Sequence, residues 1–219
     1  MDSGGIISKA KTKQILDILN ERYPEPKTEL KFTTPFELLV ATILSAQTTD
    51  RQVNKITGNL FDKWRTPEEF ANLQAETLEE EIKSCGLFKN KAQNITAASK
   101  ILVNHYNSEI PNNLEALIKI PGVGRKTANV VLANAFGQDV IAVDTHVFRV
   151  SNRLGLADSE SVGGTEKQLM ENIPVGLRND AHHWLILHGR HTCKARTPLC
   201  SECPVHSYCR FLNHRPGSI

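Results

Sequence analysis

Apolar residues recur along this chain at the three- and four-residue spacing of amphipathic helices, and no segment shows a convincing strand pattern. Residues 9–22 place four aliphatic side chains on one stripe, which predicts a helix with one buried face. Residues 36–46 are apolar nearly all round, so we expect a central buried helix there. Helices are expected at about 9–22, 34–46, 50–64, 78–84, 90–106, 114–118, 125–136, 144–154, 165–172 and 178–191, and one more is expected to begin at Thr66.

Several of these helices begin at recognisable caps. Thr34, Pro35 and Glu37 have the spacing of a capping box with proline in the first turn, and the segment Thr66–Glu69 repeats it. The run 140–143 is the best strand candidate, but it is short and leads directly into Asp144, which is expected to be an N-cap. The pattern therefore predicts an all-α fold.

Composition adds little to this picture. The chain has 219 residues, 40% of them apolar and 23% charged, which is ordinary for a soluble globular protein. No apolar run is long enough to span a membrane, and the first residues lack the apolar core of a secretory signal. We therefore expect a cytoplasmic protein in a reducing compartment.

Charge is unevenly distributed although the net charge is only +2. Residues 66–82 hold six Glu and no basic residue, whereas residues 188–219 hold five cations against Glu202. The second segment would attract a polyanion, although two ordinary solvated faces explain the pattern equally well. The five cations are Arg190, Lys194, Arg196, Arg210 and Arg215.

The segment LIKIPGVGRKTANVVLANAF, residues 117–136, predicts a helix, a tight turn and a second helix. Gly122 and Gly124 can expose backbone on either side of Val123, and the helix beginning near Arg125 offers free N–H groups. A phosphate could bind there, although an ordinary turn between packed helices would look similar. The flanking pattern has the form of a helix-hairpin-helix, which binds DNA backbone without reading bases.

Lys126 and Asp144 are the candidate catalytic residues. The positive helix end and the neighbouring Arg125 favour the neutral amine of Lys126, which is a nucleophile able to form a Schiff base. A solvated or phosphate-binding lysine is the plainer alternative. Asp144 could combine its capping role with stabilising positive charge at a sugar C1′ or relaying a proton.

Four of the five cysteines lie close together, whereas Cys85 stands alone and is expected to be a small buried side chain. In a reducing compartment four such thiols indicate a metal site. Their spacing leaves zinc and iron–sulfur equally open. The nearby His182, His183, His188 and His191 are expected to pack rather than bind metal. The spacing is Cys193-x6-Cys200-x2-Cys203-x5-Cys209.

The hairpin segment, IAVDTHVFRV, HHWLILHGRHTC and the four cysteines together resemble the endonuclease III family of DNA glycosylases, in the family's order. The resemblance covers about residues 30–209. It implies a bifunctional enzyme that removes oxidised pyrimidines from double-stranded DNA and cleaves 3′ to the abasic site by β-elimination. Lys126 matches the family's Schiff-base lysine and Asp144 its catalytic aspartate. The cysteine spacing matches its 4Fe-4S loop, which decides between the two metals.

The resemblance also implies DNA contacts and a domain arrangement. Gln47 and Leu87 match residues that enter the base stack, and Lys194 and Arg196 would face phosphates from a loop fixed by the cluster. We expect two helical domains: residues 28–138 with the hairpin, and residues 1–27 with 139–219 around the cluster. DNA would lie between them, and the protein would act as a monomer, near the nucleoid if bacterial.

Other classes of protein remain to be distinguished. Adenine-excising relatives share the cluster but usually lack the lysine, and oxidised-purine relatives have the lysine but typically lack the cysteine loop. A non-catalytic DNA-binding scaffold or a small iron–sulfur redox protein would need only part of the pattern.

Overall fold

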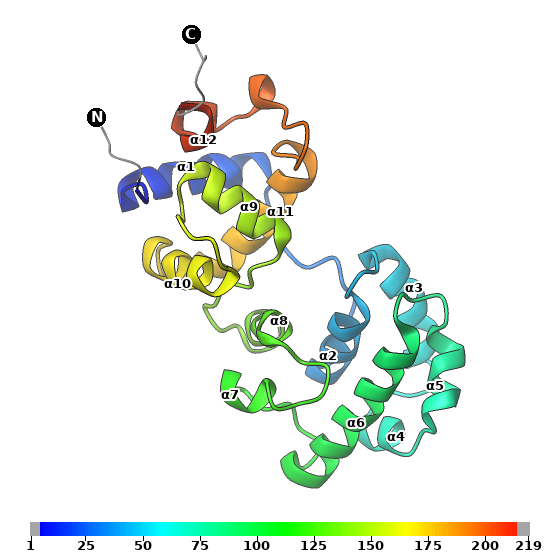
Figure 1. The fold of residues 1–219 in the computed structure, drawn as a ribbon. Helices are drawn as coiled ribbons and strands as arrows, with labels where there is room; N and C mark the ends of the chain where they lie inside the picture. The colour runs from blue at the N-terminus through cyan, green and yellow to red at the C-terminus, as the bar shows by residue number, and fades with distance from the viewer. Residues whose placement is uncertain (1–4, 214–219) are drawn as a thin grey trace. The chain divides into compact units, whose positions relative to one another are not determined.

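A computed structural model describes residues 5–213, and these residues form helices without any strand (Figure 1). The all-α prediction is confirmed. The elements are α1 (Lys9–Arg22), α2 (Pro35–Leu44), α3 (Asp50–Phe61), α4 (Pro67–Ala71), α5 (Ala75–Ile82), α6 (Phe88–Tyr106), α7 (Leu114–Leu117), α8 (Arg125–Phe136), α9 (Thr145–Leu154), α10 (Val162–Asn172), α11 (Arg178–His191), the 3-10 turns Cys200–Glu202 and His206–Tyr208, and α12 (Arg210–Asn213). Arg215 lies outside the described residues.

Contacts divide the chain into two compact units, Thr28–Gln138 and a second made of Met1–Lys27 with Asp139–Ile219. In the first unit α2 is the central helix, as its continuous apolar sequence predicts. Nine consecutive side chains, Phe36–Leu44, are buried. Helix α2 packs against α3, α6 and α8, and α6 also carries α4 and α5 (Figure 1). The hairpin helix α8 is therefore anchored directly on the core of this unit.

The two expected capping boxes differ in the structure. Thr66 and Glu69 form the reciprocal pair of bonds that defines the motif. At α2 the Thr34 hydroxyl accepts from the Glu37 N–H at 3.1 Å, but the Glu37 carboxylate accepts from Thr33 N–H and Oγ1 at 2.6 and 2.7 Å. The prediction of a capping box at Thr34 is therefore half right, because Thr33 offers the carboxylate two donors at once.

The second unit is built from both ends of the chain. Helix α1 supplies Ile15, Leu16 and Leu19 to a core shared with α9, α10 and α11. The Trp184 indole donates to the Tyr23 carbonyl at 3.2 Å, which ties the end of α1 to α11. Residues 140–143 form no strand among the described residues, although Ile141, Ala142 and Val143 are buried. They lead directly to Asp144, the N-cap of α9.

The boundaries of three helices differ from the expected ones. Helix α3 ends at Phe61, before Trp64, and α5 spans Ala75–Ile82 instead of 78–84. Helix α10 begins at Val162, three residues before its expected start. No helix among residues 5–213 is long and apolar enough to cross a membrane.

Candidate functional site

The turn between α7 and α8 combines one inward side chain with two exposed glycines. Val123 is buried, and its N–H donates to the Ile120 carbonyl at 3.1 Å. Gly122 has a φ of +77°, and a Cβ there would lie 2.9 Å from the Asn94 Cβ. Glycine is therefore required at position 122 both by its dihedral angle and by the close approach of α6.

Helix α8 begins without a side-chain cap. Gly124 occupies the N-cap position, and the Ala128 N–H makes a helical hydrogen bond to its carbonyl at 2.9 Å. Because Gly124 has no side-chain oxygen, it supplies no side-chain cap to the first-turn N–H groups, which form the positive end of the helix dipole. This geometry suits an incoming phosphate.

Lys126 is the second residue of α8 and is exposed, as is the preceding Arg125. The helix places both cations on the turn that follows the exposed glycines. The Val123 side chain points into the core, so only its backbone could face a ligand. The hairpin thus presents backbone N–H groups and a lysine amine on one short stretch of surface.

Asp144 caps α9 from the second unit, and its side chain is 18% exposed. Its Oδ1 accepts from the N–H groups of His146 and Val147, both at 2.8 Å. Its Oδ2 lies 3.3 Å from Nδ1 of His146. The predicted cap is therefore present, and it fixes the carboxylate because Oδ1 is hydrogen-bonded to the first turn of the helix.

Helix α9 also carries two arginines that bind the start of the cysteine loop, residues 193–209. Arg149 donates to the carbonyls of Cys193 at 3.2 Å and Gly189 at 3.0 Å. Arg153 donates to the carbonyls of Lys194 and Ala195, both at 2.8 Å. The helix that begins at Asp144 therefore holds the loop in place through main-chain contacts.

The cysteine loop brings four thiols into one region of the second unit. Burial raises the pKa of Cys203 to about 11, and repulsion from thiolates at the other three cysteines acts in the same direction. Burial likewise raises the pKa of Cys209. The thiols therefore influence one another electrostatically, and metal binding must displace their protons. These residues are Cys193, Cys200, Cys203 and Cys209.

The geometry of the loop does not by itself identify a metal. Among residues 5–213, no group of three or more His, Cys, Asp or Glu side chains is arranged to hold a single metal ion. The loop lies between α11 and α12, with one 3-10 turn starting at Cys200 and another ending just before Cys209. Four thiols on such a short irregular segment fit a multinuclear iron–sulfur cluster as a loop cross-link.

Three of the four histidines of α11 are buried, and the fourth is exposed. His182 and His183 are buried with their rings edge to face, and the His182 Nδ1 lies 2.7 Å from the Ala142 carbonyl. His188 is fully buried and its Nε2 lies 3.6 Å from the Cys203 sulfur. His191 is exposed beside Tyr23.

Gln47 and Leu87 share an uncommon backbone conformation. Both lie in the left-handed region, with φ of +54° and +59°, although neither is glycine or asparagine. Leu87 is 59% exposed and Gln47 is also exposed. Such a conformation costs about 1–3 kcal/mol and persists only where surrounding contacts enforce it. Exposed residues with a strained backbone are often found at ligand-binding sites.

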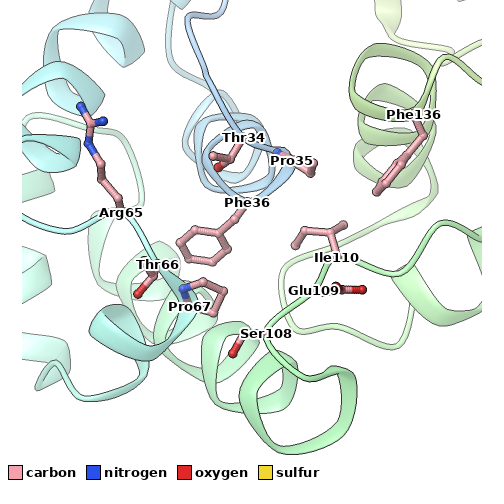
Figure 2. Close-up of a pocket in the computed structure, with 10 residues that line it drawn as sticks. All are labelled: Thr34, Pro35, Phe36, Arg65, Thr66, Pro67, Ser108, Glu109, Ile110 and Phe136. Atoms are coloured by element: carbon pink, nitrogen blue, oxygen red, sulfur yellow. The ribbon is translucent and has the colours of Figure 1, made fainter.

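A separate cavity of about 360 Å³ lies in the unit 28–138. Figure 2 shows Phe36, Pro67, Ile110 and Phe136 around it, with Arg65 at its edge. None of the residues predicted to bind DNA or metal lines this cavity. It is therefore not part of the candidate site.

Sequence reasoning missed three residues that organise these features. Arg149 and Arg153 hold the cysteine loop, and Lys91 is a buried lysine with partners near Gln47. Each of the three side chains donates a hydrogen bond to a main-chain carbonyl more than 40 positions away in sequence. An R-x3-R spacing on α9 is the only local signal that could have indicated the arginine pair.

Comparison with known proteins identifies the family. Residues 40–175, more than half of the chain, match the family model described as HhH-GPD superfamily base excision DNA repair protein, and residues 193–209 match the iron-sulfur binding domain of endonuclease III. Endonuclease III of Rickettsia conorii is 52% identical over 90% of this chain and 94% of its own length. The chain belongs to the endonuclease III family.

Further relatives agree with this assignment. Endonuclease III of Escherichia coli strain K12 is 48% identical over 94% of this chain and 97% of its own length. A solved endonuclease III trapped as a covalent intermediate with DNA superposes with a TM-score of 0.89, at 46% identity over 94% of this chain and 97% of that one. A thermostable thymine-DNA glycosylase, at 23% identity and a TM-score of 0.83, shares the fold over 92% of this chain and 96% of that one.

Membership of the endonuclease III family settles what the spacing of the motifs left open. The protein is a DNA glycosylase and AP lyase of base excision repair that acts on double-stranded DNA. Its cofactor is a 4Fe-4S cluster, so the zinc alternative is excluded.

Proposed function

We propose that this endonuclease III family member uses Lys126 to excise oxidised pyrimidines and then cleaves the strand by β-elimination. The observation that carries the proposal is the position of Lys126. It is exposed on the first turn of α8, directly after the glycine hairpin and its uncapped N–H groups. A phosphate bound by Gly122, Gly124 and Arg125 would hold the backbone within reach of this amine.

In the proposed reaction the neutral Lys126 amine attacks C1′ of an extruded nucleotide. A bond forms between Nζ and C1′ as the bond from C1′ to the base breaks, and the departing base takes up a proton. The sugar ring then opens: the C1′–O4′ bond breaks, O4′ takes up a proton and the nitrogen loses one, which gives the Schiff base. The Schiff base acidifies C2′, so loss of a C2′ proton expels the 3′ phosphate. Water then releases Lys126 from the cleaved strand.

Asp144 is assigned to charge stabilisation and proton transfer. Its carboxylate is held by two backbone N–H groups, which keeps the oxygens in a defined orientation. A fixed negative charge stabilises the oxocarbenium-like sugar that develops as the base leaves. The same group could carry a proton to or from the reacting nucleotide.

Gln47 and Leu87 are assigned to opening the duplex. A glycosylase must extrude its target and fill the space left in the stack. Both residues are exposed and fixed in left-handed conformations, so their side chains project from rigid points on the unit 28–138. We assign Gln47 to the gap that the extruded nucleotide leaves, and Leu87 to the opposite side of the base stack.

Cys193, Cys200, Cys203 and Cys209 are assigned as the four cluster ligands. Bound there, the cluster would cross-link a loop whose regular structure is limited to two 3-10 turns. Lys194 and Arg196 lie between the first two ligands, both are exposed, and Arg153 fixes the Lys194 carbonyl. We assign these two cations to phosphate contacts. The protein is proposed to act as a monomer in the bacterial cytoplasm, on nucleoid DNA.

Borohydride trapping tests the mechanism. Wild-type holoprotein should form a covalent adduct with duplexes containing an abasic site or an oxidised pyrimidine such as thymine glycol, and Lys126→Ala should form none. Lys119→Ala, which removes an exposed lysine from the same hairpin, is the matched control and should retain the adduct. An active wild-type protein that gives no adduct would overturn the Schiff-base mechanism.

Substrate choice is tested on the same protein. Duplexes containing an oxidised pyrimidine should be cleaved faster than duplexes containing 8-oxoguanine opposite cytosine or adenine opposite 8-oxoguanine. Preference for either purine substrate would assign the protein to another branch of the superfamily. The absorption of the purified holoprotein should show a broad iron–sulfur band that Cys203→Ser loses.

A further inference from the structure

Lys91 is a buried lysine in the first turn of α6, and it has an unusual set of partners. Its side chain lies in the interior of the unit 28–138 and the residue is only 3% exposed. Its ammonium donates to the carbonyls of Leu44 at 2.8 Å and Ala46 at 2.6 Å, and lies 3.2 Å from Thr48 Oγ1 and 3.0 Å from Cys85 Sγ. In the part of the chain that the structure describes, no carboxylate pairs with it.

The Leu44 carbonyl is the last of α2, and the Ala46 carbonyl lies in the turn that follows the helix. The last carbonyls of a helix have no intrahelical partner, and the helix dipole places negative charge there. A buried ammonium is stable only where hydrogen bonds and negative potential replace its water. Lys91 therefore caps α2 from a different helix, and the geometry explains how a charge is tolerated in this core.

The same lysine contacts both segments that carry the strained residues. Ala46 and Thr48, which bind the ammonium, are the two neighbours of Gln47. The backbone N–H of Lys91 donates to the Leu87 carbonyl at 3.1 Å. The two segments also meet directly, since a Cβ on Gly86 would lie 3.4 Å from the Gln47 carbonyl oxygen.

We propose that Lys91 is a positioning residue that holds Gln47 and Leu87 in the conformations needed to open the duplex. The inference rests on the assignment of those two side chains to the base stack under the proposed function. Lys91 itself touches neither DNA nor the reacting atoms. Without its charge, the Leu44 carbonyl keeps only the weaker S–H donor of Cys85, the Ala46 carbonyl loses the ammonium, and the segments at 45–48 and 85–88 lose a group that contacts both.

The test separates opening of the stack from chemistry on the sugar. Lys91→Met keeps the length of the side chain and removes the charge. Lys100→Met, an exposed lysine on the same helix, is the matched control. Holoprotein variants are compared under single turnover on two substrates: a duplex with a paired oxidised pyrimidine, and a single strand with a preformed abasic site, which has no stack to open.

Lys91→Met should lower the rate on the duplex by roughly tenfold or more, because small misplacements of positioning groups have effects of this size. Cleavage of the single-stranded abasic site should fall by less than about twofold, and Lys100→Met should change neither rate. Equal losses on both substrates would indicate general damage to the fold and would overturn the proposal, as would the absence of any loss.

Thr48→Val keeps the test decisive if Lys91→Met does not fold. It removes one partner of the ammonium while keeping the shape of the side chain, and it should give a smaller loss that is again confined to the duplex. A Thr48→Val protein with unchanged duplex activity would contradict the proposal. Gln47→Ala and Leu87→Ala distinguish failure of the proposed function from failure of the role of Lys91. If neither variant impairs duplex cleavage, the proposed function fails. If both impair it and Lys91→Met does not, only the role of Lys91 fails.

Discussion

At the scale of single residues, the candidate site consists of side chains whose functional and structural roles overlap. Asp144 is the clearest example, because the carboxylate assigned to the sugar is also the N-cap of α9. Capping uses the ability of the oxygen to accept hydrogen bonds, whereas stabilising a cationic sugar uses its charge. The two roles can therefore be separated by substitution.

Asp144→Asn should separate them. The amide oxygen can still accept from the N–H groups of His146 and Val147, so the free energy of unfolding should change by less than about 1 kcal/mol. The glycosylase rate should fall by roughly 10²- to 10⁴-fold because the charge is lost. Thermal unfolding and single-turnover kinetics measure the two effects. A stable variant of normal rate would remove Asp144 from the chemistry.

His183 gives a pH-dependent contribution to stability. Burial lowers its pKa in the folded protein from 6.5 to about 3, with positive charge at His182 and Arg190 acting in the same direction. Between these values the unfolded chain binds a proton that the folded chain does not, so stability falls as the pH drops through this range.

His183→Gln should therefore flatten the dependence of the melting temperature on pH below about 6.5. Melting curves of the holoprotein at several values between pH 4.5 and pH 7.5, on the order of half a unit apart, measure the effect. His191→Gln, at an exposed histidine of the same helix, should leave the dependence as it is. Parallel curves for wild type and His183→Gln would contradict the burial argument.

The roles of some residues could be predicted because their partners are close in sequence, whereas the roles of others could not. Asp144 and Thr66 are recognisable as caps because each bonds to groups two or three positions away. Lys91 could not be predicted because its acceptors lie at the end of α2 and in the turn after it, and sequence spacing says nothing about that proximity. The left-handed conformations at Gln47 and Leu87 are equally hidden, since neither residue type favours them.

At the scale of elements, the hairpin between α7 and α8 is defined by a contact with α6. Asn94 lies against Gly122, so the turn is fixed by its neighbour as well as by its own sequence. The two glycines are consequently unequal. Gly122 has a positive φ and no room for a side chain, whereas Gly124 has a φ of −86° and open space around it.

Gly122→Ala should be far more damaging than Gly124→Ala. A Cβ at 122 meets Asn94 at 2.9 Å in a strained backbone conformation, so we expect a loss of about 1–3 kcal/mol in unfolding free energy together with weaker DNA binding. Gly124→Ala is the comparison variant and should cost less than about 1 kcal/mol, because its φ suits an L-residue and only the N-cap preference for glycine over alanine is lost. Chemical unfolding and binding to an uncleavable abasic analogue measure both. Equal effects at the two positions would contradict this account.

Periodicity predicted the bounds of α1 and α11, although Leu177 at the N-cap of α11 supplies no side-chain cap. The predicted starts were too late for α5, which has no side-chain cap, and for α10, which is capped by Ser161. Helix α5 starts at Ala75, three residues before the expected start at Leu78. Leu78 is the first periodic apolar residue, and Gln74 makes no side-chain capping bond that would mark the true start. The short α4 was placed correctly by its capping box.

At the scale of the whole molecule, the modest net charge of +2 conceals a strong local asymmetry. Binding to DNA depends on the cations that face phosphate, not on the total. The cysteine loop supplies Lys194 and Arg196 from a segment fixed by α9, while the acidic residues 66–82 lie in the other unit. The loop should therefore contribute measurably to the salt dependence of binding.

Lys194→Ala and Arg196→Ala should each reduce the slope of log affinity against log salt concentration by about 1, with little change in the glycosylase rate at saturating enzyme. Lys167→Ala, an exposed lysine on α10 of the same unit, is the control and should leave the slope unaltered. Fluorescence anisotropy with an uncleavable duplex across a range of salt concentrations measures the slope. Unchanged slopes in both loop variants would remove these residues from the interface.

The second unit is assembled from both ends of the chain, and this has a consequence for biosynthesis. When α1 leaves the ribosome, the helices that cover Ile15, Leu16 and Leu19 have not yet been made. The unit 28–138 has its own core and can fold during translation, while α1 waits with its apolar stripe uncovered. Only after α9, α10 and α11 emerge can the second core close, and the four cysteines follow α11 in the sequence. The order of synthesis therefore delays loading of the cluster until the helices of both units have been made.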